Sequence, residues 1–412
     1  MNIMDATNFR DPSVEEFDTR TLLQEATKQA AQRRYEDFLI VDVDAHHYET
    51  ESFDQIAEFI EDPVLRHLAT ANKKKGGGRA GLMTTQPGFQ DMAGRITRYV
   101  ERTNEKVPPQ PHRDITLTKR WMDALGIDMV CLFPTPMLTL GLHPQVEIEV
   151  ALSRAYNRWL CETILAPEKR FRSMLYLPFN DPKATYRMIE EFGDKPGVVG
   201  FMVTSARYKP VHDSEYVKSY ALLEEMGKPI SFHAIYNWND PMLKMMNRFI
   251  SIHALGFTVY NMVHLTNWIV NGLPERFPKL KCIWIESGLA WVPFLMQRLD
   301  NEYMMRTSEC PSLKKLPSEY MRDMYFASQP MEMVRNRKAL ELTFEMINAE
   351  TQLLYSSDYP HWDMDLPSTI YDLPFLSEQA KRNILGENAR RLFNLEPVFA
   401  ETKLAARAAR AG

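Results

Sequence analysis

The sequence predicts an α/β fold, a (β/α)8 TIM barrel with an insertion after its first strand and a helical arm at its N-terminus. Two observations carry this prediction. Short apolar runs bounded by Gly, Pro or Asp alternate with longer stretches of helical period, as expected for a parallel barrel. Two of these runs, at 38–44 and 352–357, break off at acidic and imidazole side chains, which is typical of barrel enzymes with a site at the carboxyl ends of their strands.

Eight apolar runs have the length and composition of buried strands. They are 38–44, 127–133, 173–177, 198–203, 230–234, 281–286, 324–328 and 352–357. The helix-like stretches that separate or follow them include 145–165, 182–193, 214–226, 245–275, 290–304, 333–347 and 377–393. No glycine-rich phosphate-binding fingerprint follows a strand, and there is no GxSxG motif, so neither a dinucleotide-binding domain nor a P-loop enzyme is supported.

The chain is expected to divide into three parts. Residues 1–37 are predicted to form an N-terminal helical arm, 38–398 the barrel and 399–412 a C-terminal tail. The insertion at 50–114 contains a GGG run and a PPQP segment. A long irregular segment after a barrel strand is where enzymes of this fold build lids, so we expect it to cover the rim.

The composition of the chain excludes several classes of protein. A content of 45% hydrophobic residues in 412 is ample for a large core, and a net charge of −5 gives no basic surface for nucleic acid. The four cysteines show no CxxC spacing, which argues against a thiolate zinc site or a disulfide framework and favours the cytoplasm. Neither a leader sequence nor a membrane-spanning run is indicated, so no membrane partner is expected.

Metal-binding side chains end three of the predicted strands. Asp44 and His46 end the first, His233 ends the fifth and Asp358 follows the eighth. The strands of a parallel barrel deliver their last residues to one rim, and Asp44 and His46 alternate by two, so both can point to the same side. These four residues therefore predict a divalent-metal site of oxygen and nitrogen ligands.

The chain resembles the amidohydrolase-related branch of the amidohydrolase superfamily, which includes aminocarboxymuconate-semialdehyde decarboxylase and γ-resorcylate decarboxylase. The resemblance is carried by DAH at 44–46, FH at 232–233, GLPERFPKLKCIWIESG at 272–288 and SSDYP at 356–360. It implies a distorted barrel, a divalent cation (Zn, Mn or Fe) and chemistry on a small, often aromatic, carboxylic acid. By motif, the ligands of the family fall on Asp44, His46, His233 and Asp358.

One departure from the family bears on the reaction. The sixth strand of the family normally ends in a catalytic histidine, whereas this chain has Glu286 in IESG. A glutamate can replace an imidazolium as a proton donor at neutral pH only if burial raises its pKa by about 2 to 3 units. His253 and His361 are two further candidates for supplying an imidazole to the site.

A second cation is the main alternative at the site. Glu49, Glu286, His253 and His361 would add enough ligands for two oxygen-preferring ions, as in dinuclear-iron oxygenases on the same scaffold. Four further residues are candidates for binding the substrate: Arg207 and Tyr208 for its carboxylate, and Trp238 and Trp362 for an aromatic pocket.

Three classes of function remain open. The first is a metal-dependent hydrolase or decarboxylase, the second a dinuclear iron or manganese monooxygenase, and the third a non-catalytic subunit of a larger complex. We expect a small-molecule carboxylic acid as the substrate and a homo-oligomer as the assembly, with a hetero-oligomer as the alternative.

Overall fold

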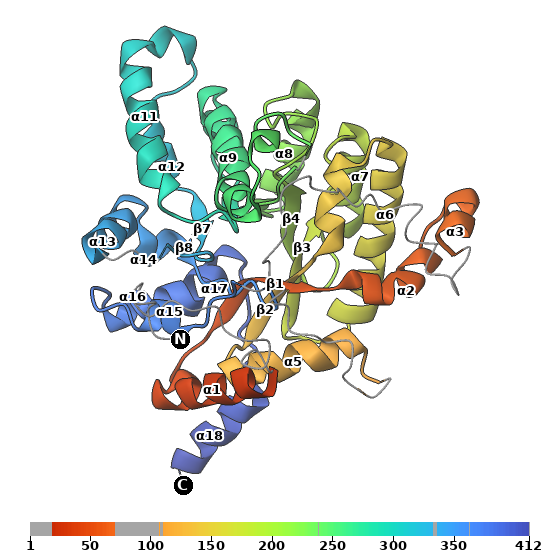
Figure 1. Cartoon of the computed structure of the whole chain (residues 1–412), viewed down its shortest axis with the longest axis vertical. Coiled ribbons are helices and arrows are strands. Elements are labelled where there is room, and N and C mark those ends of the chain that lie inside the picture. The colour runs from red at the N-terminus through yellow and green to blue at the C-terminus, as the bar shows by residue number, and fades with distance from the viewer. Residues whose placement is uncertain are drawn as a thin grey trace.

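The computed structural model describes residues 19–70, 107, 110–237, 239–332, 336–361 and 363–411. Its centre is an eight-stranded parallel sheet in the order β1 to β8, surrounded by helices (Figure 1). The strands are β1 (Val41–His47), β2 (Met129–Pro134), β3 (Phe171–Tyr176), β4 (Val198–Thr204), β5 (Ile230–His233), β6 (Cys282–Ile285), β7 (Tyr325–Ala327) and β8 (Leu353–Leu354). The predicted (β/α)8 barrel is confirmed.

The helices follow the strands in the expected alternation. Those at the N-terminal side and around the first half of the sheet are α1 (Thr19–Gln32), α2 (Phe53–Glu58), α3 (Pro63–Thr70), α5 (Arg113–Leu125), α6 (Val146–Trp159), α7 (Pro182–Phe192) and α8 (Val217–Glu225). The remaining ones are α9 (Phe249–Val270), α10 (Leu273–Arg276), α11 (Trp291–Met305), α12 (Pro317–Met321), α13 (Arg337–Met346), α14 (Ala349–Gln352), α15 (Ser368–Tyr371), α16 (Glu378–Arg382), α17 (Asn388–Leu392) and α18 (Glu401–Ala411).

Short helical turns complete these elements. They are η2 (Tyr35–Asp37), η3 (Glu49–Ser52), η5 (Pro136–Leu142), η6 (Leu160–Leu165), η7 (Ser214–Tyr216), η8 (Leu243–Met245), η9 (Thr307–Glu309) and η10 (Asn383–Glu387). Two of them, η6 and η10, are π-helical and continue α6 and α16 without a break. The long stretches predicted as single helices at 145–165 and 377–393 are therefore composite.

The barrel closes between the last strand and the first. The backbone N–H of Val43 donates to the carbonyl of Tyr355 at 3.0 Å, and that of His46 donates to the carbonyl of Tyr359 at 2.7 Å. Strand β8 itself has only two residues, fewer than the six predicted, because the N–H of Ser356 bonds to the Ser328 side chain rather than to a neighbouring strand. This irregular closure is the distortion of the barrel.

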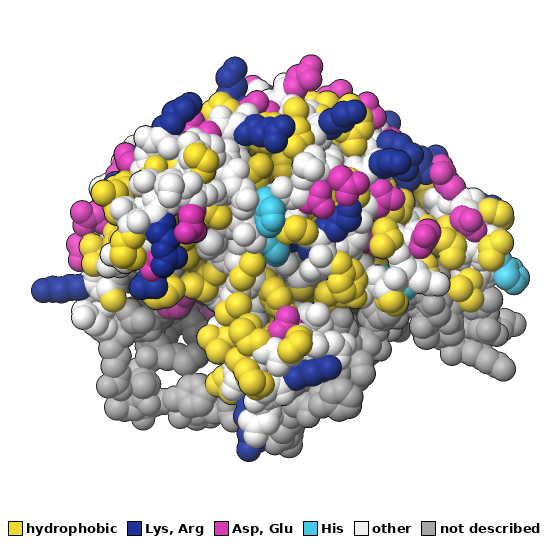
Figure 2. All heavy atoms as spheres, turned by 90° about the horizontal axis from the view of Figure 1, so that it is seen from above, with side chains coloured by type: hydrophobic (Ala, Val, Ile, Leu, Met, Phe, Trp, Pro, Cys, Tyr) yellow, Lys and Arg dark blue, Asp and Glu magenta, His cyan; other side chains and the backbone are white. Residues whose placement is uncertain are grey.

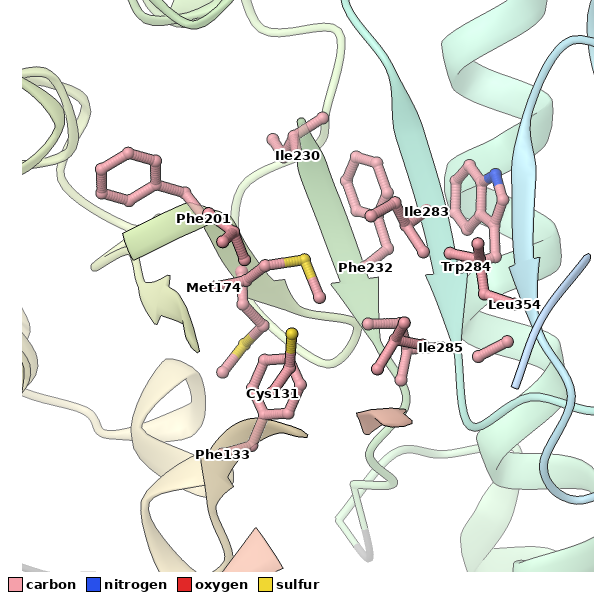
Figure 3. Close-up of a cluster of buried hydrophobic side chains, with 14 of the residues drawn as sticks. Cys131, Phe133, Met174, Phe201, Ile230, Phe232, Ile283, Trp284, Ile285 and Leu354 are labelled. Atoms are coloured by element: carbon pink, nitrogen blue, oxygen red, sulfur yellow. The ribbon is translucent and has the colours of Figure 1, made fainter. Parts of the chain in front are cut away.

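The core consists of apolar side chains from nearly every strand. Figure 3 shows Cys131 and Phe133 of β2, Met174 of β3 and Phe232 of β5 gathered with Ile283 and Ile285 of β6. All six are 2% exposed or less. Such packing holds the strand ends rigid, which is what a metal site at the rim requires.

The arm and the C-terminal helix both pack on the barrel. Helix α1 lies against α5, and Arg33 just after it pairs with Asp372 at 2.6 Å. The segment predicted as a tail contains helix α18, whose Lys403 reaches Asp128 at 2.6 Å beneath the barrel. Of the predicted lid, residues 71–106, 108 and 109 lie outside the described residues, so a cover over the rim stays a prediction.

The described surface agrees with the charge of the sequence. On the face shown in Figure 2, acidic and basic side chains are interspersed among hydrophobic ones. Among the described helices, none is both long and apolar enough to cross a membrane.

Candidate metal centre

Four predicted ligands meet at the carboxyl rim of the barrel. His46 Nε2 lies 3.3 Å from Asp44 Oδ1 and 3.2 Å from Asp358 Oδ1, and His233 Nε2 lies 3.3 Å from Asp44 Oδ1. All four side chains are completely buried. Residues from β1, from the end of β5 and from the turn after β8 are thus brought together as the sequence predicts.

The two imidazoles are oriented by backbone carbonyls. His46 Nδ1 lies 2.8 Å from the carbonyl oxygen of Pro134, and His233 Nδ1 lies 2.9 Å from that of Ala234. A carbonyl oxygen only accepts hydrogen bonds, so each Nδ1 carries a proton in these contacts, and each Nε2 is the nitrogen that faces the carboxylates. A metal-binding histidine is commonly held through its Nδ1 in this way and binds the cation through Nε2 once that nitrogen is deprotonated.

The donor set fits a divalent cation. Asp44 Oδ2, His46 Nε2 and both carboxylate oxygens of Asp358 are buried and have no hydrogen bond of good geometry within the described part of the chain. Buried polar atoms are nearly always satisfied, so several such atoms in one place indicate a missing partner. Two carboxylates and two neutral imidazoles are ligands that zinc, manganese and iron all accept.

The ionised forms of Asp44 and His46 stabilise each other. Burial opposes ionisation of Asp44, but the neighbouring His233 and His46 outweigh this effect and lower the pKa of Asp44. Burial likewise opposes the charged form of His46, yet the contacts with Asp358 and Asp44 raise the pKa of His46 to about 10. The two carboxylates thus favour a positive charge between them, and a divalent cation that bound there would take the place of the proton on His46.

His361 and Glu286 lie beside these four residues. His361 Nδ1 is 2.7 Å from Asp358 Oδ1, and its ring stacks on that of His46 with 4.3 Å between ring centroids. Glu286 follows β6 in the left-handed conformation (φ 57°), which is rare for a residue with a side chain. Its carboxylate oxygens lie 3.4 Å from His233 Nδ1 and 3.9 Å from His361 Nδ1.

The surroundings of Glu286 favour its protonated form. Burial and the negative charges of Asp358 and Asp44 raise the pKa of Glu286 well above its ordinary value. A carboxylic acid whose pKa is raised keeps its proton to a higher pH and can donate it, the task that an imidazolium would otherwise perform.

Two other predicted members of a second metal site are not brought into the cluster. The oxygens of Glu49 accept backbone hydrogen bonds from Thr135 at 2.9 Å and Met137 at 2.6 Å, so the side chain caps the start of η5. His253 lies on α9 with Nε2 3.6 Å from Asp363 Oδ2. Within the described chain, neither is among the residues whose ligand atoms converge.

The residues predicted to bind a substrate carboxylate also lie elsewhere. The guanidinium of Arg207 is held over the ring of Phe179 at 4.8 Å and that of Phe232 at 5.9 Å. Because Phe232 and His233 are consecutive in β5, their side chains point to opposite faces, and Arg207 lies on the face away from His233. Tyr208 is 62% exposed and donates its hydroxyl hydrogen to the Leu142 carbonyl. Trp238 and Trp362 lie outside the described residues.

Sequence reasoning missed two polar residues next to the ligands, Asp42 and Ser357. Both are completely buried, and Ser357 Oγ donates to Asp42 Oδ2 at 2.6 Å. The signal was present in the sequence, because Asp42 continues the alternation of Asp44 and His46 one step inward along β1.

Comparison with known proteins places this geometry in a family. A family model described as amidohydrolase matches residues 43–395. The γ-resorcylate decarboxylase of Polaromonas sp. JS666 is 25% identical over 291 residues, which cover 67% of this chain and 86% of that protein. The 2-amino-3-carboxymuconate-6-semialdehyde decarboxylase of Dictyostelium discoideum is 20% identical over 66% of this chain and 74% of its own length.

Solved structures of similar fold include two decarboxylases. The 5-carboxyvanillate decarboxylase of Novosphingobium aromaticivorans, solved with manganese and 4-hydroxy-3-methoxy-5-nitrobenzoic acid, has a TM-score of 0.64 and 22% identity, with 87% of this chain and 97% of that chain covered. A dihydroxybenzoic acid decarboxylase from Polaromonas sp. JS666, solved with manganese and 2-nitroresorcinol, has a TM-score of 0.61 and 20% identity over the same shares of both chains. These similarities establish the fold.

Proposed function

The chain belongs to the amidohydrolase family, and from this premise we propose that it is a metal-dependent decarboxylase of a small aromatic carboxylic acid. The observation that carries the proposal is the group of buried ligand atoms on Asp44, His46 and Asp358 at the barrel rim, for which the described part of the chain offers no hydrogen bond of good geometry. We prefer decarboxylation to hydrolysis because the relatives found by sequence and the solved structures described above are named as decarboxylases.

Asp44, His46, His233 and Asp358 would hold the cation. A divalent cation there supplies a concentrated positive charge that binds the anionic oxygens of a substrate carboxylate or phenolate. The rigid strand ends and the carbonyls on each Nδ1 keep the ligands in place while the substrate enters.

Glu286 is the residue proposed to supply the proton. The carbon that bears the carboxylate gains a proton, its bond to the carboxyl carbon breaks, the bonding electron pair returns to the ring and CO2 leaves. The carboxyl group of Glu286 favours its protonated form and lies against the same cluster, so it is suited to this transfer. His361 contacts both Asp358 and Glu286 and would hold the two acids apart.

A second candidate function rests on a second possible ligand group. His46, Asp358 and His361 have ligand atoms close enough to share an ion, and this group overlaps the group of Asp44, His46 and His233 at His46. Two ions in one rim would favour a dinuclear iron or manganese monooxygenase.

Metal reconstitution distinguishes the two candidates. The protein is stripped with a chelator and reloaded with manganese or iron, and bound metal is counted by mass spectrometry. CO2 release from 2,6-dihydroxybenzoate and 5-carboxyvanillate is then measured without oxygen, and oxygen uptake is measured separately in air. We expect CO2 release with one cation per chain and none after stripping. Two ions per chain with oxygen uptake and no CO2 would support the monooxygenase and contradict the proposal.

A further inference from the structure

Asp42 is a buried carboxylate one step inside the barrel from the predicted ligands. Its Oδ1 accepts hydrogen bonds from the backbone N–H of Asp44 at 3.1 Å and of Ser357 at 2.9 Å, and its Oδ2 accepts from Ser357 Oγ at 2.6 Å. One of these partners, Asp44, is itself a predicted ligand on β1. The other, Ser357, directly precedes the predicted ligand Asp358 after β8. Asp42 therefore joins the two chain segments that carry Asp44 and Asp358.

Ser357 extends this link to the turn after β8. While its hydroxyl donates to Asp42, the same oxygen accepts the backbone N–H of Tyr359 at 3.1 Å. Between these two contacts lies Asp358, whose own N–H donates to the carbonyl of Asp44 at 2.8 Å. The peptide units before and after Asp358 are thus both held.

The backbone of Asp358 needs such support. Its φ of 56° is in the left-handed region, which is unfavourable for a residue with a Cβ. A conformation of this kind persists only where surrounding contacts impose it. At Asp358 this conformation points the carboxylate toward His46. Both of its oxygens are buried and have no hydrogen bond of good geometry within the described part of the chain.

We infer that Asp42 and Ser357 are positioning residues that fix the carboxylate of Asp358 relative to that of Asp44 and so determine how tightly the centre binds a cation. The inference rests on the proposed assignment of Asp44 and Asp358 as ligands. Burying a carboxylate in a barrel core is costly, and an apolar side chain would serve packing better. All three hydrogen bonds that Asp42 accepts come from Asp44 and Ser357, in the segments that carry the predicted ligands. A positioning role therefore explains why a carboxylate lies here.

The neighbouring link between β7 and β8 supplies a matched control. Ser356 is as deeply buried as Ser357, and its hydroxyl oxygen accepts the backbone N–H of Gln329 at 2.8 Å. Replacing Ser356 with Ala removes a buried serine hydroxyl from the same segment without touching the Asp42 link.

The test compares manganese binding by folded variants. Mn(II) affinity and the electron paramagnetic resonance spectrum of bound Mn(II) are measured for the wild type, Ser357→Ala, Ser357→Thr and Ser356→Ala, after circular dichroism has verified folding. Ser357→Ala is expected to weaken binding about 10- to 100-fold and change the spectrum, as residues that orient ligands do. Ser357→Thr keeps the hydroxyl and should restore both, and Ser356→Ala should resemble the wild type.

Asp42→Leu keeps the inference testable if Ser357→Ala does not fold. Leucine has a similar shape but no acceptor oxygen, so all three hydrogen bonds to Asp42 are lost and binding should again weaken. Combining it with Ser357→Ala should cost little more than the stronger single change, because both remove the same link. Wild-type affinity and spectrum in Ser357→Ala and Asp42→Leu would overturn the inference. Failure of the wild type itself to bind manganese would instead overturn the metal centre.

Discussion

The backbone N–H of Asp358 donates a 2.8 Å hydrogen bond to the carbonyl oxygen of Asp44, which joins the end of the barrel sequence to its beginning. The contact lies where the sheet closes, and it brings the carboxylates of both residues to His46 Nε2 at 3.3 and 3.2 Å. The contacts that close the barrel therefore also bring the candidate metal ligands together.

His233→Ala should lower the metal content of the purified protein well below one ion per chain. His233 offers a buried Nε2 whose orientation is fixed by the Ala234 carbonyl. His143→Ala is the control, because His143 is also buried but bonds within its own turn at Gln145. Mass spectrometry of the metal on folded protein makes the comparison, and equal metal content in both variants would refute the role of His233.

Glu286→Gln should lower kcat about 10²- to 10⁴-fold, the usual share of a general acid. The substitution keeps the shape of the side chain but removes its ionisable proton. Metal content should stay near one ion per chain, because Glu286 is not among the described residues whose ligand atoms converge. Turnover and metal content are measured together. If turnover, metal content and pH profile are all unaltered, Glu286 has only a structural role.

Glu149→Gln should make the protein less sensitive to alkaline pH. Burial raises the pKa of Glu149 from 4.5 to about 8, although hydrogen bonds from Asn180 and Tyr176 oppose this effect. Between these two values the folded chain holds a proton that the unfolded chain has released, so stability falls as the pH rises through this window. Glutamine removes this penalty. The gain in urea midpoint over wild type should therefore grow from about pH 5 to about pH 8, and a constant difference would count against the prediction.

Asp128→Asn should destabilise the protein by about 3–5 kcal/mol, the cost of leaving one buried charge without its partner. Asp128 is completely buried and Lys403 is 4% exposed, with 2.6 Å between Oδ2 and Nζ. Asp372→Asn is the control, because its bridge to Arg33 is half exposed and should contribute no more than about 1 kcal/mol. Denaturant unfolding measures both, and similar losses would show that the Asp128–Lys403 pair is not special.

The barrel and the positions of the candidate metal ligands could be predicted because they depend on local patterns. Apolar runs fix where strands lie, and parallel strands bring their carboxyl ends to one rim whatever the details of packing. Asp44 and His46 lie on β1, His233 ends β5 and Asp358 follows β8, so their convergence follows from the topology.

The direction of side chains in turns could not be predicted in this way. Glu49 lies just beyond β1, but the chain has turned into η3 there, and its carboxylate meets two backbone N–H groups of the following β2 connection. Arg207 lies just beyond β4, and two aromatic rings on the outer face of the sheet hold its guanidinium. Both outcomes depend on tertiary neighbours that strand patterns do not reveal.

The most direct test of the central claim follows the carboxyl carbon of the substrate. The manganese-loaded protein is incubated in D2O, in parallel with and without oxygen, with an aromatic acid labelled with 13C in its carboxylate, such as 2,6-dihydroxybenzoate. We expect release of 13CO2 and one deuterium on the vacated ring carbon for each molecule converted, with or without oxygen, and no release after metal removal. Retention of the labelled carboxylate in a product that forms only with oxygen would contradict the proposed decarboxylation.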